Sequence, residues 1–140
     1  MFKSIRALGL ALVTSFPLVA TADSLEVVVQ GITKASGSIR IAVYDGEPSF
    51  KKLEAPVVGT IIPAAVPSVS FETELPAGEY AISLFHDVDG NGKLKTNLVG
   101  MPREPYGFSN NAKGKFGPPT WAASVFTVDG DTTVVIDFGH

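Results

Sequence analysis

The sequence contains no cysteine and few basic residues, and each absence excludes a class of protein. Without cysteine, the 140-residue chain can form no disulfide and is not a lipoprotein, so packing, with or without a bound ion, must hold the fold. The 11 Lys and Arg residues are outnumbered by 14 Asp and Glu, which argues against a nucleic-acid binder because such proteins carry a basic face. The length supports one domain, and the 14 Gly and 10 Pro favour short strands joined by turns.

No apolar run is long enough to cross a membrane, and the longest one lies at the N-terminus. Residues 7–19 are apolar, follow Lys3 and Arg6, and precede the small residues Ala20-Thr21-Ala22. This order is that of a secretory signal peptide, whereas a membrane span needs roughly 20 apolar residues. We therefore expect residues 1–22 to be a cleaved signal peptide, residues 23–140 to form one periplasmic domain, and no membrane span to remain after cleavage.

Hydrophobic residues alternate with polar ones in several short segments, as they do in half-buried β-strands. Segments 25–30 and 39–44 show the pattern most clearly, and Gly37 between them predicts a paired hairpin. Five more segments bring the expected total to about seven strands, namely 57–62, 66–75, 79–85, 123–128 and 132–138. The pattern predicts an all-β fold, an antiparallel β-sandwich with one long Gly/Pro-rich loop insertion.

The period-2 positions of these segments define one expected core between two sheets. Segment 79–85 is the strongest candidate for a central strand, whereas prolines near segments 57–62 and 66–75 favour edge positions for those two. Tyr80 is expected at a corner, with its hydroxyl bonded to backbone, and Phe50 is expected to face inward from a short helical turn. The expected core residues are Leu25, Val27, Val29, Ile39, Ile41, Val43, Phe71, Tyr80, Ile82, Leu84, Val125, Val134 and Ile136.

A long insertion, residues 87–121, separates the expected central strand 79–85 from the last two expected strands, 123–128 and 132–138. Eight of the 20 residues from 100 to 119 are Gly or Pro, so regular structure is not expected there. The insertion is nevertheless expected to be ordered, because it carries the apolar anchors Leu98, Met101, Tyr106, Phe108, Phe116 and Trp121. Tyr106, Phe108 and Trp121 either form an exposed stacking surface for a glycan or protein partner, or fill the space between the loop and the sheets.

The start of this insertion has the pattern of the first half of a calcium-binding loop. Asp87, Asp89 and Asn91 place oxygen side chains at positions 1, 3 and 5, and Gly92 at position 6 permits the turn that directs the Lys93 carbonyl inward. Calcium takes six to eight oxygen ligands of this kind. The spacing therefore marks this loop as a candidate calcium site.

The calcium pattern is incomplete beyond its seventh position. Position 9 is Lys95, and position 12, which should be a bidentate acid, is Leu98. A complete site needs a further ligand, for which Asn97 and Glu104 are the nearest candidates. The alternative is a metal-free network in which the acidic and amide side chains cap backbone amides. Because close carboxylates repel, an ion, donated amides or Lys95 must balance them, and the sequence leaves these alternatives open.

The motifs in and around this insertion resemble those of a known family. They are His86-Asp87, Gly90-Asn91-Gly92-Lys93-Leu94, Thr96-Asn97, Gly100, Pro102, Glu104, Tyr106-Gly107-Phe108-Ser109-Asn110-Asn111 and Gly117-Pro118-Pro119. On these residues the chain resembles the exported bacterial family called domain of unknown function 2141. The resemblance implies a prealbumin-like or carboxypeptidase-regulatory-like β-sandwich and attaches no activity to it. Members generally carry an acid where this chain has Lys95, which weakens the implication of calcium.

A catalytic interpretation rests on His86, which precedes Asp87 and lies near Glu104 in the sequence. Adjacent strand residues point to opposite faces, so a histidine that hydrogen-bonds the loop directly after its strand is the more common outcome. Common catalytic motifs such as G-x-S-x-G and H-E-x-x-H are absent. Two function classes remain: a non-catalytic envelope module that binds a protein or glycan, and a small metal-dependent hydrolase using His86, Asp87 and Glu104.

Overall fold

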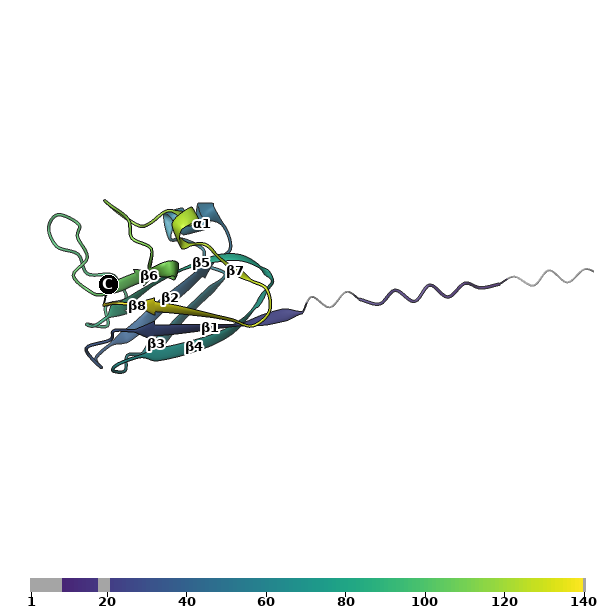
Figure 1. Ribbon diagram of the computed structural model, residues 1–140, viewed down its shortest axis with the longest axis horizontal. Coiled ribbons are helices and arrows are strands. Elements are labelled where there is room, and N and C mark those ends of the chain that lie inside the picture. The colour runs from purple at the N-terminus through teal and green to yellow at the C-terminus, as the bar shows by residue number, and fades with distance from the viewer. Residues whose placement is uncertain (1–8, 18–20, 140) are drawn as a thin grey trace, which may run out of the picture.

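The computed structural model describes residues 9–17 and 21–139. Lys3, Arg6 and Ala20 of the expected signal peptide lie outside these residues. Residues 9–17 form neither helix nor strand, and they lead away from the sheets (Figure 1). Among the described residues, no helix is long and apolar enough to cross a membrane. Among the described residues every strand lies within 22–137, so the chain from Ala22 onward contains both sheets.

In the described part of the chain, eight strands form two sheets, which confirms the all-β prediction. One sheet has the order β4-β1-β8, and the other has the order β3-β2-β5-β6, with β7 paired to β5 (Figure 1). The strands are β1 (Ala22–Gln30), β2 (Ser38–Tyr44), β3 (Val58–Pro63), β4 (Val69–Pro76), β5 (Gly78–Asp87), β6 (Tyr106–Phe108), β7 (Phe126–Val128) and β8 (Thr132–Asp137). The eighth strand is β6, which lies inside the segment that we expected to be a loop.

The expected hairpin between the first two strands is wrong. β1 pairs with β4 and β8, whereas β2 pairs with β3 and β5, so the connection between β1 and β2 crosses from one sheet to the other. β7 and β8 are likewise divided between the sheets. The β1–β8 pair is parallel, so the sheets are not wholly antiparallel. Alternation identifies the buried face of a strand but not its hydrogen-bonding neighbour, which explains both errors.

The expected strand 123–128 begins too early. Its first residues belong to the short helix α2 (Trp121–Ser124), which is capped by the Thr120 side chain accepting a hydrogen bond from the Ala123 amide at 3.2 Å. Only Phe126–Val128 forms a strand. Val125 therefore lies outside the core cluster, and Val128 is the fully buried apolar residue of this segment.

Side chains from both sheets form one hydrophobic core, as expected. Ile82 and Leu84 of β5 are 0% and 3% exposed, which confirms the predicted register of the central strand. Phe71 packs against the core but is only partly buried. β3 and β4 both lie at sheet edges, as their prolines predicted. The fully buried members of the cluster are Leu25, Val27, Val29, Ile39, Val43, Ile82, Val128 and Ile136.

A second, smaller cluster covers part of the outer face of the β3-β2-β5-β6 sheet. Its centre is Phe50 of helix α1 (Glu47–Lys52), which is 1% exposed and confirms the expected inward orientation. The Phe50 ring lies 5.7 Å from that of Tyr44, 6.1 Å from that of Phe108 and 5.9 Å from that of Trp121, in edge-to-face geometry. These contacts attach helix α1 and part of the long insertion to the sheet.

Tyr80 takes the corner position that the sequence predicted. Its ring is buried, and its hydroxyl donates to the Pro76 carbonyl at 2.7 Å, across the tight connection from β4 to β5. We predict that Tyr80→Phe lowers the free energy of unfolding by about 1 kcal/mol, because the carbonyl loses its donor while the ring packing stays. Urea unfolding measures this change; an unaltered midpoint would show that the hydrogen bond contributes nothing.

Candidate metal centre at the end of β5

The candidate centre forms where β5 ends and the long insertion begins. The connection between β1 and β2 packs directly on this end, since a Cβ atom at Gly37 would lie 2.0 Å from the Asp87 carbonyl oxygen. The insertion returns to the same place, where the His86 amide donates to the Pro105 carbonyl at 2.8 Å. Two segments that are distant in sequence therefore converge on the last two residues of β5.

Asp87 is the buried anchor of the centre, with a relative exposure of 0%. Its Oδ2 atom accepts hydrogen bonds from Arg40 Nε and the Gly92 amide, both at 2.9 Å, and its Oδ1 atom accepts one from the Asn91 amide at 3.2 Å. Burial by itself raises the pKa of Asp87, but hydrogen bonds from the Arg40 side chain and the Gly92 amide, together with the Arg40 charge, lower it below the ordinary value. Asp87 is thus held as a carboxylate.

The next two acceptors of the predicted calcium pattern shape the loop itself. Asp89 Oδ1 accepts from the Asn91 amide at 3.2 Å, and Asn91 Oδ1 accepts from the Lys93 amide at 2.9 Å. Gly92 adopts a φ of +80°, as the turn at position 6 requires. These are the Asx turns of the metal-free alternative.

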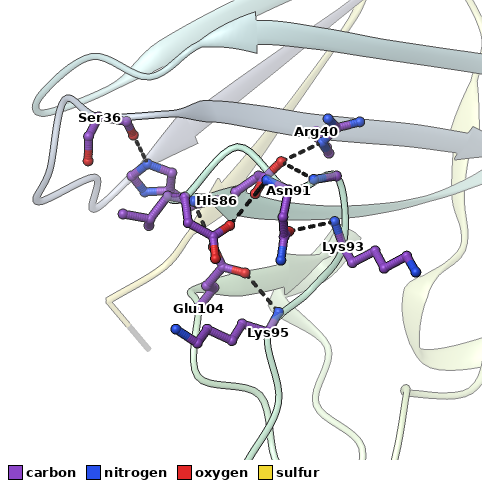
Figure 2. Close-up of polar contacts among 11 residues, drawn as sticks. Ser36, Arg40, His86, Asn91, Lys93, Lys95 and Glu104 are labelled. Carbon is purple, nitrogen blue, oxygen red and sulfur yellow. Dashed lines mark hydrogen bonds and ion pairs between the residues drawn. The ribbon is translucent and has the colours of Figure 1, made fainter.

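Glu104 closes the loop from its far end. It is 6% exposed, and its two carboxylate oxygens accept from the Val88 and Lys95 amides, both at 2.7 Å (Figure 2). Asp87, Asp89 and Glu104 each offer a carboxylate oxygen within 4.8 Å of the others. Of the two further ligands proposed from the sequence, the fold therefore brings Glu104 to the group.

The three carboxylates carry more negative charge than the surrounding protein balances. Among the described residues, the ion pair between Arg40 and Asp87 is the only one. The structure therefore gives Lys95 no ion pair with the group, and its amide rather than its ammonium contacts Glu104. A carboxylate has about four acceptor positions. Asp89 uses one of them and Glu104 two, so oxygen lone pairs remain for a hard cation such as Ca²⁺.

Two other residues expected near the metal lie outside the carboxylate group. Asn97 Oδ1 accepts from the Val99 and Met101 amides, at 3.0 and 2.9 Å, and so organises a separate turn. The His86 ring is buried, and its Nε2 atom donates to the Ser36 carbonyl at 2.7 Å. His86 therefore bonds the β1–β2 connection, rather than the loop that follows it.

His86 also lines an open cleft beside the carboxylate group. The cleft has a volume of about 480 Å³, and Asp89 and Glu104 contribute to its wall. Asp87 does not line it, since its carboxylate is directed to Arg40. The three residues of the hydrolase hypothesis thus do not converge on one cavity.

Tyr106, Phe108 and Trp121 do not form one exposed surface. Phe108 is 7% exposed and belongs to the cluster around Phe50, which Trp121 also contacts. Tyr106 alone of the three is about half exposed, at 48%. It lines an apolar pocket of about 260 Å³ on the outer face of the β3-β2-β5-β6 sheet, together with Leu94 of the loop and other residues.

Sequence reasoning missed Arg40, the cation that holds the centre. Arg40 lies on β2, 47 residues before Asp87, and nothing in an alternating strand marks one polar residue as the partner of a distant carboxylate. The pairing of β2 with β5 would have revealed it. The register sets Ser38 opposite Asp87 and Arg40 opposite Phe85, so Arg40 lies two positions from Asp87 on the neighbouring strand.

Sequence reasoning also missed the structural role of the segment around Ser109. The Ser109 hydroxyl is fully buried, accepts from the Ile82 amide at 2.9 Å and donates to the Ser124 carbonyl at 2.5 Å. Asn111 accepts from the Asp137 amide at 3.0 Å. These contacts join the insertion to β5, α2 and β8, so polar contacts order it in addition to the aromatic cluster around Phe50.

Together, the fold and the centre define an all-β domain of two sheets with an acidic loop at the end of a central strand. The model of the family described as "Uncharacterized protein conserved in bacteria (DUF2141)" matches residues 27–136, and the chain belongs to this family. The match includes Arg40 and every residue of the carboxylate group. Comparisons with curated proteins and with solved structures found no match.

The lowered pKa of Asp87 predicts a loss of stability in acid. Since the folded-state pKa lies below the unfolded value of about 4, the stability from Asp87 is complete above that value and is lost as pH falls through the folded pKa. In metal-free buffer, Asp87→Asn should therefore show a shallower decline in unfolding free energy from about pH 5 downward. The exposed acid Asp129, replaced by Asn, serves as the control; equal slopes for both variants would contradict the assignment.

Proposed function

We propose that this protein is an exported, non-catalytic envelope module whose loop at the end of β5 binds a divalent cation of the calcium type. The observation that carries the proposal is the meeting of Asp87, Asp89 and Glu104 within 4.8 Å, two of them buried. The proposed architecture is a β-sandwich of the prealbumin-like or carboxypeptidase-regulatory-like kind, which the shared core of the two sheets supports.

The charge of the group favours a divalent ion. Three carboxylates face one guanidinium, so a doubly charged cation would balance the excess. Glu104 supplies the acid that position 12 of the loop lacks, although it comes from beyond the loop. Both Glu104 oxygens already accept amides, so its coordination would be weaker than that of a free bidentate glutamate. We therefore expect modest affinity.

The pocket beside Tyr106 is the proposed surface for a glycan or protein partner. Leu94, which follows the carboxylate loop, and Arg40, which binds Asp87, both line this pocket. Tyr106 offers an exposed ring for stacking and Arg40 is a donor at the pocket wall. A cation that fixes the loop would thereby fix one wall of the pocket.

The hydrolase alternative is less well supported by the same geometry. A metal-dependent hydrolase would need His86, Asp87 and Glu104 to share a centre facing a cleft. Nε2 of His86 is engaged by the Ser36 carbonyl, and Asp87 faces Arg40. We therefore retain the non-catalytic proposal.

Calcium should raise the thermal stability of the protein. With the chain from residue 22 onward, we expect an increase of about 2.7 kcal/mol in unfolding free energy when calcium is a hundredfold above its Kd. Asp89→Asn and Glu104→Gln should each reduce the increase, because each removes a charged ligand. Melting curves in calcium and in chelator measure the effect.

The matched control for this experiment is Asp129→Asn, which removes one exposed carboxylate outside the group. This variant should keep the full response to calcium. If the unaltered protein melts at the same temperature in both buffers, the carboxylates form a metal-free network and the cation proposal fails.

Export should remove the N-terminal 22 residues. Strand β1 begins at Ala22, so the proposed cleavage leaves the strand almost whole. Mass spectrometry of the protein from the periplasmic fraction should show Asp23 as the first residue. An intact N-terminus at Met1 in that fraction would refute the proposed processing.

A further inference from the structure

Residues 95–103 form an ordered hairpin that projects from the sheets. The Arg103 amide donates to the Lys95 carbonyl at 2.6 Å, and Asn97 donates its amide to the Met101 carbonyl at 2.8 Å. The Asn97 side chain also accepts two amides within the tip. In Figure 1, the green segment after β5 extends beyond both sheets before it returns to β6. Its backbone conformation is therefore fixed from within.

The tip of this hairpin presents apolar side chains to solvent. Leu98 is fully exposed, Val99 is 81% exposed and Met101 is 60% exposed. Phe116, in the same insertion, is also fully exposed. Leu98, Met101 and Phe116 were expected to anchor the insertion, and that expectation is wrong. Large apolar side chains that remain exposed on an ordered tip point to a binding surface.

Lys95 and Arg103 flank the apolar tip on the two arms of the hairpin, and they lie in a segment richer in basic residues than the protein as a whole. Five of the nine Lys and Arg residues that follow residue 22 lie within 93–115, a segment whose one acid is Glu104. Glu104 is buried at the carboxylate group, and within the described part of the chain none of these five basic residues forms an ion pair. The exposed charge of the segment is therefore positive.

We propose that the 95–103 hairpin docks on an anionic phospholipid surface. Leu98, Val99 and Met101 enter the boundary between headgroups and acyl chains, and Lys95 and Arg103 contact the phosphates. Apolar tips flanked by basic residues have the two features that peripheral membrane binding requires, apolar area and attraction to anionic lipid. This function goes beyond cation binding and does not depend on it.

A lipid surface accounts for these observations better than a protein partner does. The apolar side chains stand on a protruding turn rather than in a groove, and basic residues lie on both arms of the hairpin at Lys95 and Arg103. A flat anionic surface complements a protruding apolar tip with this charge.

Vesicle sedimentation tests the proposal with the chain from residue 22 onward. The protein should bind vesicles of phosphatidylglycerol and phosphatidylcholine at low salt, and should bind pure phosphatidylcholine vesicles much less. The double variant Leu98→Ser/Val99→Ser should lose about tenfold or more in partitioning, since it removes the inserted apolar area. Lys95→Glu/Arg103→Glu should lose a similar factor.

Matched controls separate the tip from the rest of the surface. Ile61→Ser replaces an apolar side chain, 57% exposed, on β3, and Lys51→Glu/Lys52→Glu reverses two charges on helix α1. Both controls should bind vesicles as the unaltered protein does. Asp89→Asn should also bind, so failure of the cation proposal would leave this one intact.

Three results would overturn the proposal. They are absence of binding to anionic vesicles at low salt, binding by Leu98→Ser/Val99→Ser equal to that of the unaltered protein, and an equal loss in the Ile61→Ser control. Because the substituted side chains are exposed, unchanged melting temperatures should show that every variant is folded.

Discussion

The contact between Arg40 and Asp87 is the constraint on which the arrangement of the long insertion depends. Asp87 ends the central strand in full burial, and a buried carboxylate without partners would be strongly destabilising. Arg40 on the neighbouring strand and the amides of Asn91 and Gly92 supply those partners. The loop must therefore fold back over the end of β5, and this return brings Asp89 toward Glu104.

Polar contacts, together with the packing of Phe108 and Trp121 against Phe50, order the rest of the insertion. Glu104, Ser109 and Asn111 each bind backbone amides, and together they attach the segment to the β5 loop and to both sheets. Leu98 and Phe116 take no part in these contacts and remain exposed. The two proposals concern neighbouring parts of the insertion. Glu104 of the carboxylate group accepts the Lys95 amide and so fixes the base of the hairpin, and the hairpin tip stays available for contact with a lipid surface.

The sequence predicted the local features well, because they depend on local chemistry. Period-2 alternation identified the buried faces of β1, β2 and β5, and the corner role of Tyr80 follows from its place after a tight turn. Spacing within the loop identified Asp87 and Asp89 as members of the carboxylate group, and Glu104 was a candidate because it lies nearby in the sequence.

The features that the sequence did not predict depend on contacts between distant segments. β1 and β2 belong to different sheets, and β1 pairs with β8 in parallel. The alternation of apolar and polar residues in these strands predicts neither arrangement. The partnership of Arg40 with Asp87 follows only from that strand order. Leu98 was wrongly expected to anchor the insertion, because the composition of a loop does not show whether a side chain points toward the core or toward solvent.

A crystal structure of the protein grown with saturating calcium, with anomalous diffraction data, tests the central claim most directly. The account predicts an anomalous peak with oxygen ligands from Asp87, Asp89 and Glu104 at about 2.3–2.6 Å, and Arg40 still bound to Asp87. Absence of a peak at saturating calcium, with the three carboxylates bonded only to amides and Arg40, would contradict it and leave the loop as a purely structural network.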